Sequence, residues 1–258
     1  MLAIMIGTIV NCIAIIVGSL LGILFARKIS EDLSDVIRSA AGIVTLIIGM
    51  QMALQVQNVI YLALALIIGG ILGSWWDVDG KILALGHFLE RRFGTASRTA
   101  VATEAAAQGT PGDGNNSRFA YAFLNSSVLF CVGAMAIVGS FKAGTEGDYT
   151  MLYTKSVLDG FMSIVFAAAM GIGTAFSALS ILVYQGLLTL GSQYIKQWVS
   201  PQMITELTAT GGALILMIAI NLLRLRSLKT ANYLPAIVVI VAFILADPII
   251  VRIAAFIV

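Results

Sequence analysis

The feature that most constrains this chain is a succession of apolar runs, each about twenty residues long. Charged residues make up only 11% of the chain and the mean hydropathy is +0.99, whereas soluble proteins carry roughly 25% charged residues. Such a run crosses lipid only as a helix, because lipid offers the backbone no hydrogen-bond partner. The sequence therefore predicts an all-α fold, a polytopic helix bundle of about eight membrane segments in one integral membrane domain.

The eight segments are expected at residues 3–26, 38–54, 58–76, 119–141, 157–172, 174–195, 206–223 and 232–255. The run at 157–172 is short for a span. The sequence therefore leaves open whether residues 157–195 cross fully or are partly re-entrant. Residues 1–9 hold no lysine or arginine, so no signal peptide is expected.

The basic residues predict an orientation. Eleven of the fifteen fall in one set of loops, and only four (Lys142, Lys155, Lys196 and Arg252) fall in the other. The positive-inside rule places the richer set in the cytoplasm and both termini outside it. The net charge of +2 is too small to suggest nucleic acid. Cys12 and Cys131 lie in apolar runs and are interpreted as buried thiols, so neither a metal site nor a cofactor is expected.

The longest cytoplasmic loop, 78–117, has two predicted parts. Residues 78–93 place most apolar side chains on one helical face, which is typical of a helix at the headgroup surface. His87 is interpreted as a passenger on that helix. Residues 94–117 are rich in Ala, Thr and Gly and are predicted to be a flexible linker.

An internal repeat is predicted from an ungapped alignment of residues 30–77 with 200–247. It pairs Ser30 with Ser200, Gly42 with Gly212, Gln51 with Asn221 and Asp77 with Asp247. The second segment matches the seventh, five crossings later, so the two copies are inserted in opposite directions. Inverted repeats are typical of secondary transporters. The alternative is that the glycines merely permit close helix packing.

With the repeats assigned to 1–77 and 173–258, residues 118–172 form a central hairpin in which polar residues gather. Positions 155, 159 and 163 lie on one helical stripe. An ionisable group inside a membrane is a functional-site hypothesis by default. Candidate substrate- or ion-binding residues are Asn11, Asn125, Ser126, Ser127, Lys155, Ser156, Asp159, Ser163 and Gln185. Two alternatives stay open: Lys155 extends to the interface with Asp159 as a local partner, or the serines bond to their own backbone.

The motifs of soluble enzymes are missing from the sequence. It contains no HExxH, GxSxG or P-loop pattern, and the chain has one histidine. We therefore expect that the protein is not an enzyme. A membrane enzyme that uses Lys155, Asp159 and nearby serines is the remaining alternative of that class.

Three stretches resemble a known family: "GTIVNCIAIIVGSLLG" (7–22), "FCVGAMAIVGS" (130–140) and "KSVLDGFMSIVFAAAMGIGTAFSALSILVYQGLLTL" (155–190). They are similar to the YqgA-like bacterial integral membrane proteins, domain-of-unknown-function family 554. The chain departs from the pattern at Ala134, where proline is expected, and at Thr174, where valine is expected. The first departure puts a kink in the fourth segment in doubt. The resemblance implies a multi-pass protein of the bacterial inner membrane, without a known substrate.

The predicted function is transport of a small solute or ion across that membrane, with a polar site formed by the central hairpin. A channel is one alternative, and a scaffold or signalling protein that acts through the 78–117 loop is another. The lipid bilayer and the solute are the expected partners. The spacing of Gly18 and Gly22 is compatible with internal packing or with a homo-oligomer.

Overall fold

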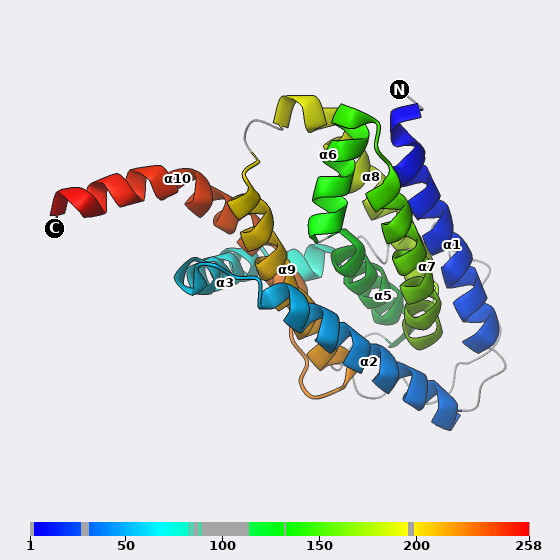
Figure 1. Cartoon of the computed structure of the whole chain (residues 1–258). Helices are drawn as coiled ribbons and strands as arrows, with labels where there is room; N and C mark the ends of the chain where they lie inside the picture. Colours follow the sequence, from blue (N-terminus) through cyan, green and yellow to red (C-terminus); the bar gives the residue numbers. More distant parts are fainter. Residues whose placement is uncertain are drawn as a thin grey trace.

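The computed structural model describes residues 3–26, 31–82, 84, 88, 114–131, 133–195 and 199–257 (Figure 1). Over these residues the chain is helical and contains no strand, which confirms the all-α prediction. The elements are η1 (Ala3–Met5), α1 (Ile6–Ala26), α2 (Glu31–Ala53), α3 (Val59–Trp75), α5 (Gly114–Cys131), α6 (Ala134–Glu146), α7 (Thr150–Met170), α8 (Gly173–Ile195), α9 (Pro201–Leu222), η4 (Thr230–Tyr233) and α10 (Pro235–Ile257).

The described helices agree with about eight membrane segments. Six stretches are long and apolar enough to cross a membrane: α1, most of α2, α7, α8, α9, and residues 230–247 of η4 and α10. The bent pair α5–α6 is a seventh candidate, and α3 is an apolar helix of 17 residues. These elements correspond in order to the eight expected segments.

The segment containing Lys155 begins earlier than the sequence indicates. α7 starts at Thr150 and has 21 residues, and α8 has 23. At 1.5 Å per residue α7 is about 31 Å long, sufficient for a full crossing. Polar residues in the first turns of α7 lower its hydropathy without ending the helix. Lys155 and Asp159 therefore lie within a long helix and not at its N-terminal end.

The fourth segment, where Ala134 put a kink in doubt, is broken into two helices. Its two parts, Phe119–Cys131 and Met135–Glu146, meet at an angle of 59°. Gly133 stands at the break with φ +150°, a conformation that favours glycine, and its carbonyl accepts the N–H of Ala136 at 3.1 Å. The bend is therefore present although Ala134 replaces the expected proline.

The long loop is described only at its two ends. Val78 and Ile82 pack against the central apolar core, and α5 already begins at Gly114, inside the predicted linker. Apart from Ala84 and Phe88, residues 83–113 lie outside the described residues, and His87 is among them.

The directions in which helices pack agree with alternating crossings. α1 and α7 run parallel, since Gly7 meets Leu152, Gly18 meets Gly160 and Gly22 meets Ile164. α2 and α9 run antiparallel, since Gly42 meets Leu223 and Gly212 meets Ala53. α3 and α10 are antiparallel as well, with Gly69 against Ala236 and the ring of Tyr61 against Phe243. First and fifth crossings share a direction, whereas second and seventh, and third and eighth, oppose each other.

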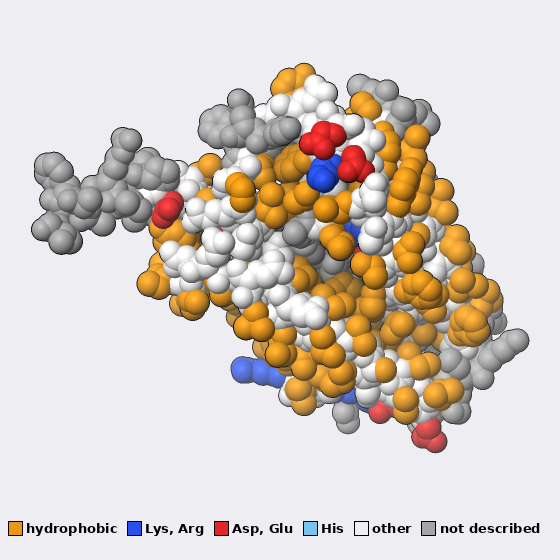
Figure 2. Space-filling view, viewed as in Figure 1, with side chains coloured by type: hydrophobic (Ala, Val, Ile, Leu, Met, Phe, Trp, Pro, Cys, Tyr) orange, Lys and Arg blue, Asp and Glu red, His pale blue; other side chains and the backbone are white. Residues whose placement is uncertain are grey.

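The central core joins α5, α7 and α9 through Leu124, Val128, Phe166, Leu214 and Ile218. The outward faces are apolar too: Ile13, Leu20 and Phe25 of α1 and Phe161 of α7 are exposed large hydrophobic residues. Figure 2 shows hydrophobic side chains spread over this face of the molecule, while charged ones gather near its ends. This inversion of the soluble pattern is what a bilayer requires.

Gly18 offers a test of the α1–α7 packing. A Cβ there would lie 2.3 Å from the carbonyl oxygen of Gly160, whereas a Cβ at Gly160 would lie 3.4 Å from Cβ of Ala14. We expect Gly18→Ala to destabilise the protein by about 1–3 kcal/mol through overpacking. Gly160→Ala, the matched control in the same interface, should have little effect. Thermal unfolding in detergent measures both, and equal midpoints would contradict the packing.

Candidate polar site between α1, α7 and α8

A buried ion pair lies inside α7. Lys155 and Asp159 are one helical turn apart, and the Lys155 Nζ donates to Oδ2 of Asp159. Lys155 is 6% exposed and Asp159 8%. Lys155 therefore does not extend to the interface, but it does pair locally with Asp159, as that alternative expected. At 1.5 Å per residue, Asp159 lies about 14 Å from the start of α7, close to the middle of the span.

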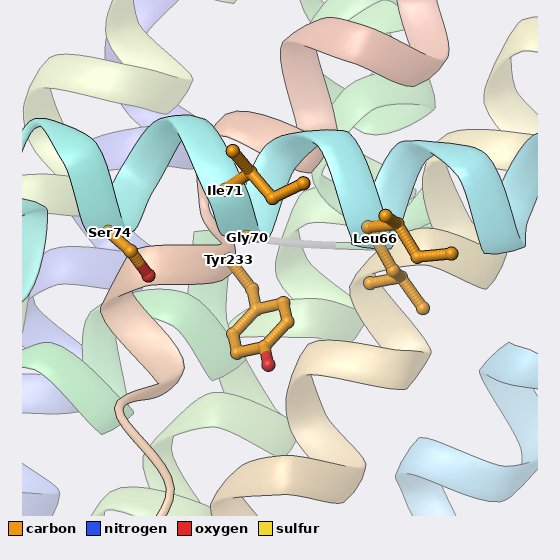
Figure 3. Close-up of a pocket in the computed structure, with 6 residues that line it drawn as sticks. Leu66, Gly70, Ile71, Ser74 and Tyr233 are labelled. Carbon is orange, nitrogen blue, oxygen red and sulfur yellow. The ribbon is translucent and has the colours of Figure 1, made fainter.

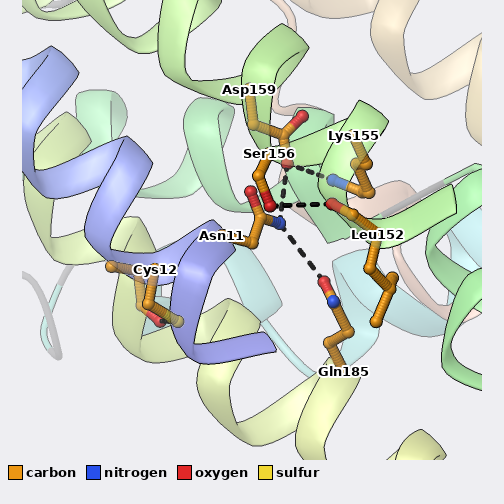
Figure 4. A network of polar contacts seen from close by, with 8 residues as sticks. Asn11, Cys12, Leu152, Lys155, Ser156, Asp159 and Gln185 are labelled. Atoms are coloured by element: carbon orange, nitrogen blue, oxygen red, sulfur yellow. Dashed lines mark hydrogen bonds and ion pairs between the residues drawn. The ribbon is translucent and has the colours of Figure 1, made fainter. Parts of the chain in front are cut away.

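Two buried amides join this pair from neighbouring helices. Asn11 of α1 donates its Nδ2 to Asp159 Oδ2 at 3.0 Å and to Gln185 Oε1 of α8 at 3.3 Å. An ionised carboxylate only accepts hydrogen bonds, so it fixes the amide nitrogen of Asn11 toward itself. That nitrogen then requires an acceptor from Gln185. Figure 4 shows it between the two partners, where the side chains of Asn11, Asp159 and Gln185 meet.

The network leaves two polar atoms unsatisfied. The Oδ1 of Asn11 and the Nε2 of Gln185 are buried and have no hydrogen-bond partner among the described residues. The first is an acceptor and the second a double donor. Leaving such groups buried and unpaired costs roughly 1–3 kcal/mol each. Unpaired buried groups of this kind are therefore expected to serve a ligand or water.

The predicted serines make other contacts. Ser156 donates to the carbonyl of Leu152 and Ser163 to that of Gly160, each at 2.7 Å, so both bond to their own helix. Ser126 and Ser127 of α5 donate across to Thr174 and Ser180 of α8, at 3.2 and 2.9 Å.

Asn125 donates to the sulfur of Met170 at 3.8 Å. The structure therefore connects Asn11, Lys155, Asp159 and Gln185, and it places the three α5 residues in separate contacts. Thr174, where the family resemblance predicted valine, supplies the hydroxyl that Ser126 reaches.

Two further acids with buried or cross-helix contacts were not among the candidate site residues. Glu206 of α9 is fully buried, and its Oε1 accepts the backbone N–H of Gln57 at 3.1 Å and of Asn58 at 2.7 Å. Asp247 of α10 accepts the hydroxyl of Tyr61 at 2.5 Å. Glu206 stands at the predicted start of its segment, where an acid is normally interfacial, so sequence alone did not mark it. No group of three or more His, Cys, Asp or Glu that suits a metal occurs among the described residues.

A shallow pocket of about 490 Å³ lies beside α3 (Figure 3). Its lining is largely apolar and carries no charged side chain: Leu66, Ile67, Gly70, Ile71, Ser74 and Tyr233. It shares no residue with the polar network and is therefore a feature of the α3 surface.

The fold and the buried network define a multi-pass helical membrane protein with a polar centre. The chain belongs to the family described as "Protein of unknown function (DUF554)", which matches residues 6–245, and the resemblance noted in the sequence is confirmed.

It is 30% identical to "Uncharacterized membrane protein YdfK" of Bacillus subtilis (strain 168) over 239 residues, 91% of this chain and 93% of that protein. It is 26% identical to "Uncharacterized protein YqgA" of Escherichia coli (strain K12) over 232 residues, 90% of this chain and 93% of that protein. No solved structure matches.

The Lys155–Asp159 pair is testable by a double-mutant cycle. Lys155→Met or Asp159→Asn alone leaves one buried charge uncompensated and should destabilise the protein by about 3–5 kcal/mol. The double variant should recover most of that loss. The exposed pair Lys142–Asp148, at 3.8 Å with side chains 43% and 40% exposed, is the control. Its single substitutions should cost at most about 1 kcal/mol. Additive losses at 155 and 159 would show that the two charges do not interact.

Proposed function

We propose that this protein is a transporter of the bacterial inner membrane that carries a small polar solute through the site between α1, α7 and α8. The observation that carries the proposal is the pair of unpartnered atoms, Asn11 Oδ1 and Gln185 Nε2, beside a buried ion pair. A donor and an acceptor held without partners near the middle of the span are suited to bind a solute in passage.

The contribution of the Lys155–Asp159 pair to folding stability does not explain why it is buried. Replacing a buried ion pair by apolar residues is often neutral or stabilising, so the pair is a weak source of folding energy. Polar groups inside a membrane are costly and are typical of solute and ion pathways. The network Asn11–Asp159–Lys155 with Gln185 fits that pattern better than a purely structural role.

The charges of the site limit which kind of solute it can bind. Lys155 and Asp159 cancel, so the network has no net charge. An ion bound there would leave an uncompensated charge near the middle of the membrane, which is costly. A neutral or zwitterionic solute avoids that cost and can still hydrogen-bond to Asn11 and Gln185. We therefore infer a small solute without net charge.

The predicted inverted repeat supports the proposal. The offset of 170 residues converts the contact of Gly42 with Leu223 into that of Gly212 with Ala53, and both contacts are present. The same offset relates α1 to α8. Under this offset Asn11 corresponds to Ile181 and Gln185 to Ile15. Asn11 contacts Gln185, and Ile15 and Ile181 belong to one buried cluster. The two amides thus come from corresponding helices of the two halves, and transporter sites typically lie at such repeat interfaces.

A ligand screen tests the proposal. The purified protein would be heated with amino acids, carboxamides, polyols, nucleosides or inorganic ions, each at several pH values. A bound solute at 100 times its dissociation constant should stabilise by roughly 2.7 kcal/mol. We expect a neutral or zwitterionic compound to raise the unfolding temperature, and the same compound to enter proteoliposomes.

Two variants make the screen specific. Gln185→Met removes the free donor and should abolish the stabilisation and the uptake. Ser156→Ala is the control, because Ser156 is buried on α7 next to Lys155 but donates its hydrogen bond to the carbonyl of Leu152 in its own helix. Uptake that survives in Gln185→Met would contradict the site, and a screen without any stabilising solute would count against transport.

A further inference from the structure

Glu206 is another buried acid, and the polar site does not use it. It stands on α9, and its side chain reaches the turn that joins α2 to α3. One oxygen accepts two backbone N–H groups of that turn, while the other, Oε2, is buried and has no hydrogen-bond partner in the part of the chain that the structure describes. Half of the carboxylate is therefore satisfied and half is not.

The surroundings of Glu206 favour a proton over a metal ion as its ligand. Among the described residues no lysine, arginine or histidine forms an ion pair with it, since the three ion pairs there involve other residues. No cluster of metal-ligating side chains accompanies it either, within the same residues. A single carboxylate falls short of the several oxygen ligands that hard cations require. A proton needs only the free oxygen.

We propose that Glu206 is a proton-binding site that controls how firmly the α2–α3 turn is held to α9. When ionised, the carboxylate accepts charge-assisted bonds from Gln57 and Asn58 and is favoured by the positive N-terminal end of α3. When Oε2 takes up a proton from water, the charge is lost and the two bonds weaken to neutral strength. Proton release restores them.

The turn gives water a short path to the acid. Gln57 is exposed and Asn58 half-buried, although Glu206 itself is fully buried. Asn58 also accepts the N–H groups of Ile60 and Tyr61 with its side chain. The turn therefore links Glu206 directly to the first turn of α3.

Other titratable groups lie on the helices packed against α9. They are Tyr61 of α3, Tyr233 of η4, Asp247 of α10, Lys142 and Glu146 of α6, and Tyr121 and Cys131 of α5, while α2 has none between residues 39 and 53. Tyr61 and Asp247 bond to each other, and Lys142 pairs with Asp148. The carboxylate of Glu206 accepts the N–H groups of Gln57 and Asn58, so replacing Glu206 leaves the Tyr61–Asp247 and Lys142–Asp148 pairs in place.

The inference rests on the proposed function in one respect. The turn belongs to the first half of the predicted repeat and Glu206 to the second, so proton binding would loosen one half from the other. In a carrier, that change couples proton movement to solute movement. Proton binding itself is measurable without any solute.

Infrared spectroscopy of the purified protein in D₂O tests the inference. The C=O stretch of a protonated carboxyl group should grow as pH falls in the wild type. Glu206→Gln, which keeps the accepting Oε1, should lose that titrating component. Glu206→Asp should keep one at a shifted midpoint. Asp148→Asn is the control: it should lose only the contribution of Asp148 itself and keep the component that Glu206→Gln removes.

A second readout follows the turn. Hydrogen–deuterium exchange at residues 57 and 58, corrected for its intrinsic pH dependence, should be faster at low pH in the wild type and fast at all pH values in Glu206→Gln. An unchanged infrared titration in Glu206→Gln would overturn the inference. Infrared titration at Glu206 without solute uptake would overturn the transport proposal alone, and uptake without titration would overturn this inference alone.

Discussion

The arrangement of this membrane protein depends on a charge pair that lipid would not tolerate unpaired. Lys155 and Asp159 neutralise each other inside α7, and Asp159 then fixes the amide of Asn11, which in turn orients Gln185. Three helices are thereby brought into register at one depth. Close backbone contacts at Gly18 and Gly22 allow α1 to approach α7 closely enough for these short side chains to meet.

A second set of contacts binds the remaining helices. α2 lies against α9, and α3 lies against α10. Two acids, Glu206 of α9 and Asp247 of α10, bind residues at the beginning of α3. The large apolar core between α5, α7 and α9 connects this group to the polar site. A change in how α3 is held can therefore reach the helices around Asp159 through packed side chains.

Much of the fold follows from hydropathy, because lipid demands long apolar helices. Asn11, Lys155, Asp159 and Gln185 stand out for the same reason, as polar residues in apolar runs. Three features did not follow. The polar start of α7 concealed its length, the break at Gly133 carries no proline signal, and the depth of Glu206 depends on how α9 packs. A single sequence also could not show that the α5 serines hydrogen-bond to α8 and do not join the network of Asn11, Asp159 and Gln185.

The most direct test of the central claim is whether water reaches the network. A cysteine at Thr189, one turn from Gln185 and buried, would be introduced with Cys12 and Cys131 replaced by alanine. Its reaction with a small membrane-impermeant thiol reagent would be measured from each side of oriented vesicles. A transport site predicts labelling from both sides at rates that a bound solute changes. A cysteine that stays unreactive from both sides would show that water does not reach the network and that its role is structural.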